Sequence, residues 1–355
     1  MFQKLGFSFL VLLAFIATAE GAARTFIPEE TLLFSWEQSD GLLARRADGA
    51  WSSRPGLRTQ SQDGPYTWTI RINTDGLRSD QDFTPRKSHD TYRILAVGDS
   101  WIFGFSVTQG HAMVDQVGAL LSQEWHRPVE VLNAGVLGAS AFQTLQQWQA
   151  YGARYELDAV LIGTPHNMGE QQNQAAERME WYARTTAGPA NHVRLYLLLR
   201  RFLYVVDPRS LSVPQWSINT AGQGSPDQLT AIADLTRIVS EAQKRKLAVW
   251  FGDFPGNLRG AMSAGGQPTP VDPTWSAALQ PFGAIIAGHQ LGERSCWGFV
   301  DQDHPSEAGS AAIAHTLVQA ILDNRSLSVR ATEPRCADVP EVGPGKNGWE
   351  NTPIR

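Results

Sequence analysis

The sequence has 355 residues, of which 42% are hydrophobic and 18% are charged, a balance typical of a globular protein with one large core. The formal net charge of −5 argues against a nucleic-acid-binding protein, which would carry a basic face. No group of His, Cys and Asp residues has the spacing of metal ligands, so we expect no metal and no other cofactor.

The first 19 residues have the pattern of a secretory signal peptide. Lys4 gives a positive start, residues 5–17 are apolar, and Ala17-Thr18-Ala19 offers a small-residue cleavage site, with Ala23 as a second choice. This run is too short to span a bilayer, which favours cleavage over the alternatives, an uncleaved anchor or a buried strand. We therefore expect an exported protein, secreted or periplasmic, with no membrane association after cleavage.

Residues 24–90 contain few long apolar runs and are rich in Arg, Ser, Asp and Gly. Residues 67–72 alternate like a strand and end at the turn-like sequence Asn73-Thr74-Asp75-Gly76. We interpret this region as an extended N-terminal arm with a few short strands, lying on the main domain.

Residues 91–323 alternate between short apolar runs and amphipathic stretches, and we assign them to one domain. The apolar runs are rich in branched side chains, as strands buried on both faces should be. The predicted strands are residues 93–97, 129–132, 159–163, 247–251 and 297–300, and the predicted helices are residues 111–126, 228–246 and 307–322, the last with Ser306 as its N-cap. This alternation predicts an α/β fold with a mostly parallel five-stranded sheet covered by helices.

The least regular part of this domain is residues 168–226. Within it, residues 192–206 are apolar with three arginines. We expect a packed lid helix here rather than a helix on a membrane surface, because the basic residues are too few to recognise anionic lipids. Residues 324–355, with several Pro and Gly residues, form a loosely ordered tail, and Cys296 and Cys336 either pair in a disulfide or remain thiols.

Five residues suited to catalysis follow the predicted strands, at the sheet edge where open parallel α/β sheets bind ligands. They are Ser100 after the first strand, Gly138 after the second, Asn167 after the third, and Asp301 and His304 after the last. A serine hydroxyl is a weak nucleophile until a base takes its proton, and His304 can be that base while Asp301 orients the imidazole. Preset donors must hold the oxyanion, and the Ser100 and Gly138 backbone N–H groups and the Asn167 amide can supply them.

Asp303 is an alternative to Asp301 as the partner of His304. An aspartate adjacent to the histidine in sequence would reach its ring poorly, so we favour Asp301.

These motifs resemble the sequence blocks of the SGNH (GDSL) hydrolases. Gly98-Asp99-Ser100 matches the first block, Gly138 and Asn167 match the glycine and asparagine of the second and third, and Asp301 to Pro305 match the Asp-x-x-His-Pro of the fifth. The resemblance implies a flavodoxin-like three-layer αβα sandwich and ester hydrolysis through an acyl-serine. Residues 72–78 also resemble the stretch that precedes the first block in some secreted or membrane-facing members.

We therefore predict an exported serine esterase of the SGNH type. Its expected partner is a glycan or another small ester, from which it removes short acyl groups, acetyl first among them. One alternative is an O-acyltransferase that uses the same residues to pass the acyl group to a polysaccharide. Another is an inactive, hydrolase-like binding protein of polysaccharide assembly, against which the complete set of motif residues argues.

Overall fold

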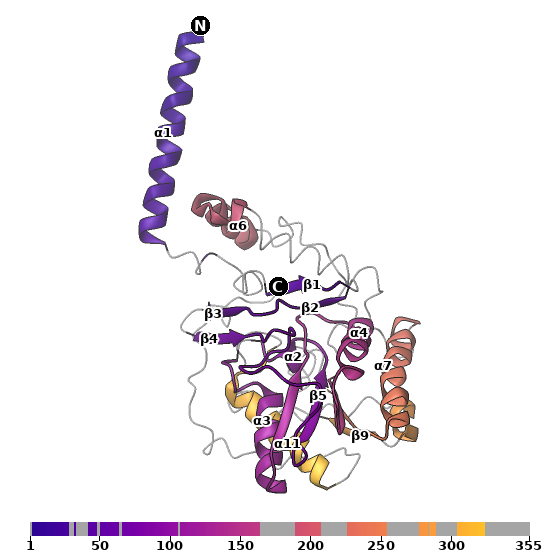
Figure 1. The fold of residues 1–355 in the computed structure, drawn as a ribbon. Helices are drawn as coiled ribbons and strands as arrows, with labels where there is room; N and C mark the ends of the chain where they lie inside the picture. The colour runs from indigo at the N-terminus through magenta and orange to yellow at the C-terminus, as the bar shows by residue number, and fades with distance from the viewer. Residues whose placement is uncertain are drawn as a thin grey trace, which may run out of the picture.

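A computed structural model describes residues 2–27, 32, 42–47, 50–63, 66–105, 107–163, 189–206, 226–253, 277–282, 284–288 and 304–323. A five-stranded sheet in the order β6-β5-β7-β8-β9, with every neighbouring pair parallel, lies at its centre (Figure 1). The strands are β5 (Tyr92–Val97), β6 (Val129–Asn133), β7 (Ala159–Gly163), β8 (Ala248–Asp253) and β9 (Ile285–Gly288). Counted along the chain this order is 2-1-3-4-5, which is the flavodoxin-like order, so the predicted fold class is confirmed.

Helices cover both faces of the sheet and give the three layers. Helices α3 (Met113–Trp125) and α11 (Glu307–Leu322) cover one face, and α4 (Ala141–Gly152) and α7 (Pro226–Lys244) cover the other. Strand β5 shows why the apolar runs lack alternation. Ile94 and Ala96 are buried under the first helix pair, while Leu95 and Val97 are buried under the second.

Most of the predicted elements are confirmed, and two differences stand out. The fifth strand described is β9, a four-residue edge strand whose short apolar run gave no clear signal, and the predicted strand at 297–300 lies outside the described residues. Helix α4 was not predicted. It is rich in glutamine, and its N-terminus is fixed by a capping box between Ser140 and Gln143. The tail at 324–355, Cys296 and Cys336 also lie outside the described residues.

The N-terminal arm forms two antiparallel hairpins that pack near the start of the main domain. They pair β1 (Leu43–Arg45) with β2 (Trp51–Ser53), and β3 (Arg58–Asp63) with β4 (Tyr66–Arg71), so the strand predicted at 67–72 is confirmed to within one residue. Trp68 and Ile70 of β4 share a buried cluster with Phe103 and Phe105. The arm therefore supports the segment that directly follows Ser100.

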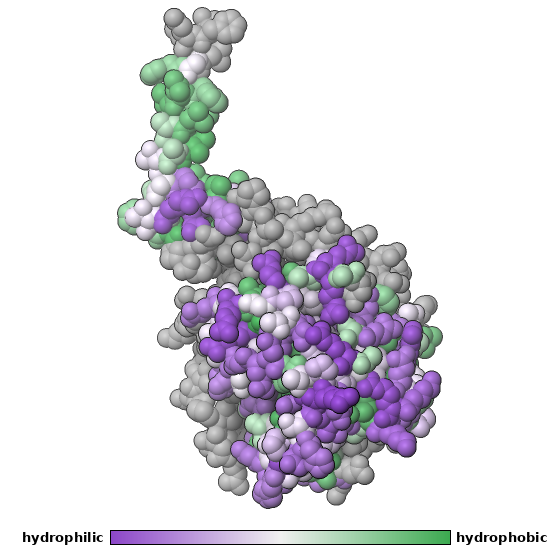
Figure 2. Space-filling model, in the orientation of Figure 1, coloured by the Kyte–Doolittle hydropathy of each residue, from purple (hydrophilic) through white to green (hydrophobic). Residues whose placement is uncertain are grey.

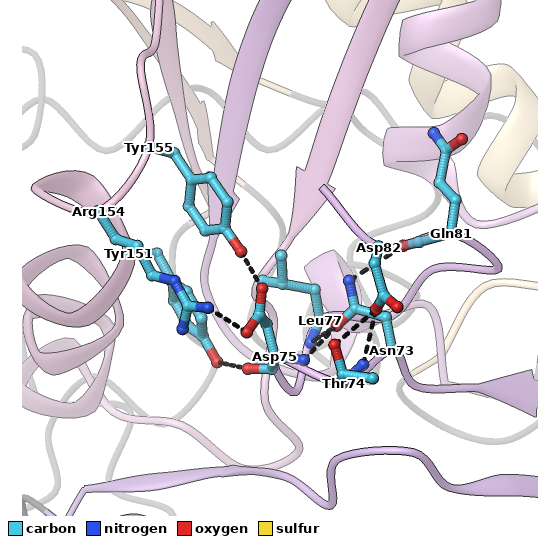
Figure 3. A network of polar contacts seen from close by, with 9 residues as sticks. All are labelled: Asn73, Thr74, Asp75, Leu77, Gln81, Asp82, Tyr151, Arg154 and Tyr155. Atoms are coloured by element: carbon cyan, nitrogen blue, oxygen red, sulfur yellow. Dashed lines mark hydrogen bonds and ion pairs between the residues drawn. The ribbon is translucent and has the colours of Figure 1, made fainter. Parts of the chain in front are cut away.

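The turn after β4 joins the arm to the end of α4 through Asp75 (Figure 3). The Asp75 carboxylate accepts hydrogen bonds from the Tyr155 hydroxyl and the Arg154 guanidinium, and its carbonyl accepts one from Tyr151 Oη at 2.9 Å. Asn73 closes the turn, since its side chain accepts from the Asp75 N–H at 3.0 Å. Burial, and then the bond to Asp75, raise the pKa of the Tyr155 hydroxyl, which therefore stays a donor at neutral pH.

The substitution Asp75→Ala should lower the free energy of unfolding by about 2 kcal/mol, because it removes a charged acceptor and leaves the Tyr155 hydroxyl unpaired. Urea denaturation measures the change. Asp90→Ala is the control, since that side chain is 88% exposed and its ion pair is with His89, which is fully exposed. Equal losses in the two variants would contradict the role given to Asp75.

Helix α1 (Phe2–Phe26) is longer than the apolar run seen in the sequence. Its stretch Gly6–Phe26, 21 residues, is long and apolar enough to cross a membrane by length and composition, a test that signal sequences also pass. The expectation that the run is too short to span is therefore wrong. The small residues that follow Ile16 continue both the helix and its apolar character.

Helix α6 (Arg194–Val206) confirms the helix expected at 192–206 but differs in its packing. Leu197 is buried, yet five other apolar side chains of the helix, and that of Val193 just before it, are between 39% and 66% exposed. These are Val193, Tyr196, Leu199, Phe202, Leu203 and Val206. The expectation of a packed lid helix is therefore wrong for the face of α6 that carries these exposed side chains.

Candidate active site

Ser100 stands at the start of a very short helix, α2 (Ser100–Phe103), directly after the turn that ends β5. The Asp99 side chain caps this helix by accepting from the Trp101 N–H at 3.0 Å. Gly98 fits because a Cβ there would lie 2.6 Å from Ile102 Cγ1. The Gly-Asp-Ser sequence is therefore a strand-to-helix turn, in which Gly98 avoids a clash and Asp99 caps the helix that Ser100 begins.

A side chain of α4 and the segment after β6 hold this turn in place. Gln147 of α4 accepts from the Gly98 N–H at 2.9 Å and donates to the Gly98 carbonyl at 3.1 Å. After β6 the chain passes so close to α2 that a Cβ on Gly135 would lie 2.3 Å from the Phe103 nitrogen. Because β6 and β7 flank β5 on opposite sides, Ser100 lies at the topological switch point, where open α/β sheets bind ligands.

His304 reaches Ser100 from the other end of the sequence. Its Nε2 lies 2.8 Å from Ser100 Oγ, although 204 positions separate the two residues. The imidazole packs on the Phe105 ring with 4.7 Å between centroids, and Ser306 caps the helix that follows by accepting from the Gly309 N–H. At this distance the imidazole can take the hydroxyl proton.

Of the other predicted site residues, the structure describes only Gly138. Gly138 lies in the loop after β6 with φ of 69°, a left-handed conformation that favours glycine. Asn167, Asp301 and the alternative Asp303 lie outside the described residues. The structure thus brings Ser100 and His304 together, and the oxyanion and orienting roles stay predictions.

Arg78, at the end of the stretch 72–78, bonds the end of α2 and the segment that follows it. The sequence predicted no role for this residue. Its buried guanidinium donates to the carbonyls of Phe103, at 2.7 Å, and of Gly104 and Val107. Burial lowers the pKa of Arg78 to about 10, with Asp115 opposing the shift, so the group stays charged at neutral pH. The resemblance of this stretch to family members was the one available signal, because no local pattern marks an arginine as buried.

A second contact joins the two halves of the site. Glu307, in the first turn of α11, accepts from the Thr108 N–H at 3.1 Å. The helix that follows His304 is thereby bonded to the loop that follows α2.

Asp115 of α3 is a buried carboxyl group near Arg78. Its burial raises the pKa of the carboxyl, against the influence of the Arg78 charge.

The substitution Arg78→Met should lower the free energy of unfolding by about 3–5 kcal/mol, because three buried carbonyls lose a charged donor. Arg78→Lys should recover part of the loss, since an ammonium keeps the charge but lacks the planar fork. Arg71→Met is the matched control from the same arm. Its ion pair with Asp80 is about half exposed and should contribute about 0–1 kcal/mol. Urea denaturation of all three variants checks this, and a small effect of Arg78→Met would refute it.

No known protein family and no curated protein matches the sequence. Among solved structures, the chain is similar to AlinE4, an SGNH-hydrolase family esterase, at 14% identity over 56% of this chain and 77% of that one, with a TM-score of 0.32. It is also similar to the psychrotrophic esterase EstA from Pseudoalteromonas sp., at 14% identity over 65% and 97% of the two chains, with a TM-score of 0.39. A two-domain esterase (CEX) active on acetylated mannans matches at 13% identity over 72% and 54%, with a TM-score of 0.36.

At these identities and TM-scores the comparisons carry no argument about the activity of this chain. The chemistry must come from the residues at the end of β5 and the start of α11.

Proposed function

We propose that this chain is a carboxylic ester hydrolase of the SGNH type that works through an acyl-serine. The observation that carries the proposal is the 2.8 Å contact between His304 Nε2 and Ser100 Oγ. A serine and a histidine from distant segments, meeting at a switch point of a parallel sheet, form the activated nucleophile that acyl transfer needs.

In this mechanism Ser100 Oγ attacks the ester carbonyl carbon while its proton passes to His304 Nε2. The Ser100 and Gly138 backbone N–H groups and the Asn167 amide stabilise the oxyanion of the tetrahedral intermediate. Collapse breaks the bond to the alcohol, which leaves with the proton from His304. Water then attacks the acyl-serine, giving its proton to His304, and the acid is released as Ser100 regains a proton. Asp301 orients the imidazole throughout.

The substrate we propose is a short acyl ester, acetyl first among them, on an extracellular glycan or another small ester. This choice rests on export, for which the apolar N-terminal helix provides support.

Ser100→Ala should reduce the hydrolysis of p-nitrophenyl acetate by about 10⁴-fold or more, because the nucleophile is lost. Ser122→Ala is the control, since that hydroxyl bonds only the Arg127 carbonyl on the surface of α3, and its rate should match wild type. Release of p-nitrophenol, followed by absorbance, measures both. Wild-type hydrolysis that persists unchanged in Ser100→Ala would overturn the assignment of the nucleophile.

Adding a glycan acceptor to the same assay distinguishes hydrolysis from O-acyl transfer. We expect acetate as the product with and without the acceptor, detected by mass spectrometry. Acetyl groups that accumulate on the glycan would instead establish the acyltransferase.

The orienting carboxylate is tested by comparing Asp301→Ala with Asp303→Ala. We expect kcat to fall by about 10²–10⁴-fold in Asp301→Ala, because the imidazole loses its tautomer and orientation, and to change little in Asp303→Ala. Steady-state kinetics on the same ester measure kcat. A larger loss in Asp303→Ala would reverse the assignment.

A further inference from the structure

Helix α1 projects from the body of the protein with its apolar side chains uncovered. Figure 1 shows it extending away from the sheet and its helices, and in Figure 2 the projecting part is mainly hydrophobic, whereas the visible face of the body is mainly polar. Only 6% of the candidate span Gly6–Phe26 is buried, and Phe7 and Phe15 are each 70% exposed. Such a surface is unfavourable in water and needs a cover.

Helix α6 lies beside the base of α1 and adds a second uncovered apolar face. Tyr196, Leu199, Leu203 and Val206 follow one another at intervals of three or four residues, so their exposed side chains share one face of the helix. Leu197, on another side, is fully buried. The helix is therefore amphipathic, with one face held by the protein and another left open.

Charged groups join the two helices at the C-terminal end of α1. The Glu20 carboxylate accepts from the backbone N–H groups of Arg194 and Leu195, each at 2.9 Å, and so caps the N-terminus of α6. Arg24 bonds both Glu20, at 2.7 Å, and the His192 carbonyl. Because α1 supplies the cap of another helix, it is bonded into the fold in a way that a discarded leader would not be.

From these observations we propose that α1 and α6 together form a membrane-binding platform, in which α1 spans a lipid bilayer and α6 lies in its interface. The polar junction of Glu20 and Arg24 then marks the headgroup level. At about 1.5 Å per residue, residues 2–19 rise about 27 Å before that junction, close to the ~30 Å hydrocarbon core of a bilayer. These residues carry one charge, near their N-terminal end.

The scarcity of basic residues on α6 does not oppose this arrangement. A free amphipathic helix needs charge or area enough to find the membrane unaided. A helix bonded to a transmembrane segment is already held at the surface, so its apolar face alone is enough to keep it there. The platform also gives the body an orientation, with α2 on the side of the sheet nearer to α1 and α6 (Figure 1).

The test uses the full-length chain in vesicles of phosphatidylcholine and phosphatidylglycerol that contain a phospholipid with a photoactivatable diazirine on its acyl chain. After illumination, tryptic peptides are analysed by mass spectrometry. We expect labelling of α1 and of the α6 peptides that carry Leu199 and Phe202, about 10-fold above labelling of α7 peptides. Because this inference does not rest on the proposed activity, the Ser100→Ala chain should give the same pattern.

Two further measurements make the test decisive. The double variant Leu199→Asp/Phe202→Asp should lose the labelling of α6 and keep that of α1, while Leu229→Asp, which alters an equally exposed leucine on α7, should change neither. The intact mass of the chain recovered from cell membranes should include α1. Labelling of α6 no higher than that of α7 in the wild type, or a mature chain that begins after Ala19 or Ala23, would overturn the platform.

Discussion

The hydrogen bond between His304 Nε2 and Ser100 Oγ is the contact on which the rest of the site depends. Two segments separated by most of the domain must meet within 2.8 Å, and neither segment can achieve this alone. A parallel sheet solves the problem because the carboxyl ends of all its strands lie at one edge. Asp99 and Gln147 fix the serine end of the contact, and Ser306 fixes the histidine end.

The four-residue helix that carries Ser100 leaves carbonyl groups without partners inside the helix, and the N-terminal arm supplies donors for some of them. A helix leaves its last four carbonyls without internal partners, so in a helix this short almost every carbonyl needs a donor from elsewhere. Asn133 donates to Ile102 at 2.9 Å, and Arg78 donates to the carbonyls that follow. An arginine suits this task because its planar fork offers several donors in fixed directions. The arm is thus part of the support of the helix that carries Ser100.

The difference between local and tertiary information explains what could be predicted from the sequence. Buried strands and the helix capped by Ser306 have local patterns, and a topological rule applied to the end of β5 placed Ser100 at the sheet edge. The contact of Ser100 with His304 was also expected, but the strand predicted just before His304 lies outside the described residues. Arg78 could not be assigned, because its role depends on carbonyls some 25 residues further along the chain. Strand β9 was missed because four residues at a sheet edge carry too little hydrophobic pattern. For the residues between β7 and α6, and those just before His304, the sequence interpretation stands alone.

The unpaired backbone groups at a helix end also explain how α6 is joined to the N-terminal helix α1. The first N–H groups of α6 need acceptors, and the one that bonds Arg194 and Leu195 is Glu20 of α1. A carboxylate inside an otherwise apolar helix is expensive in a membrane unless it is paired and lies near the interface. Its bonds to Arg24 and to the start of α6 meet the first condition, and the platform we propose would meet the second, since these bonds gather the polar groups of both helices at one level. The apolar surfaces of α1 and α6 then begin where those polar groups end, which is the pattern that a bilayer boundary imposes.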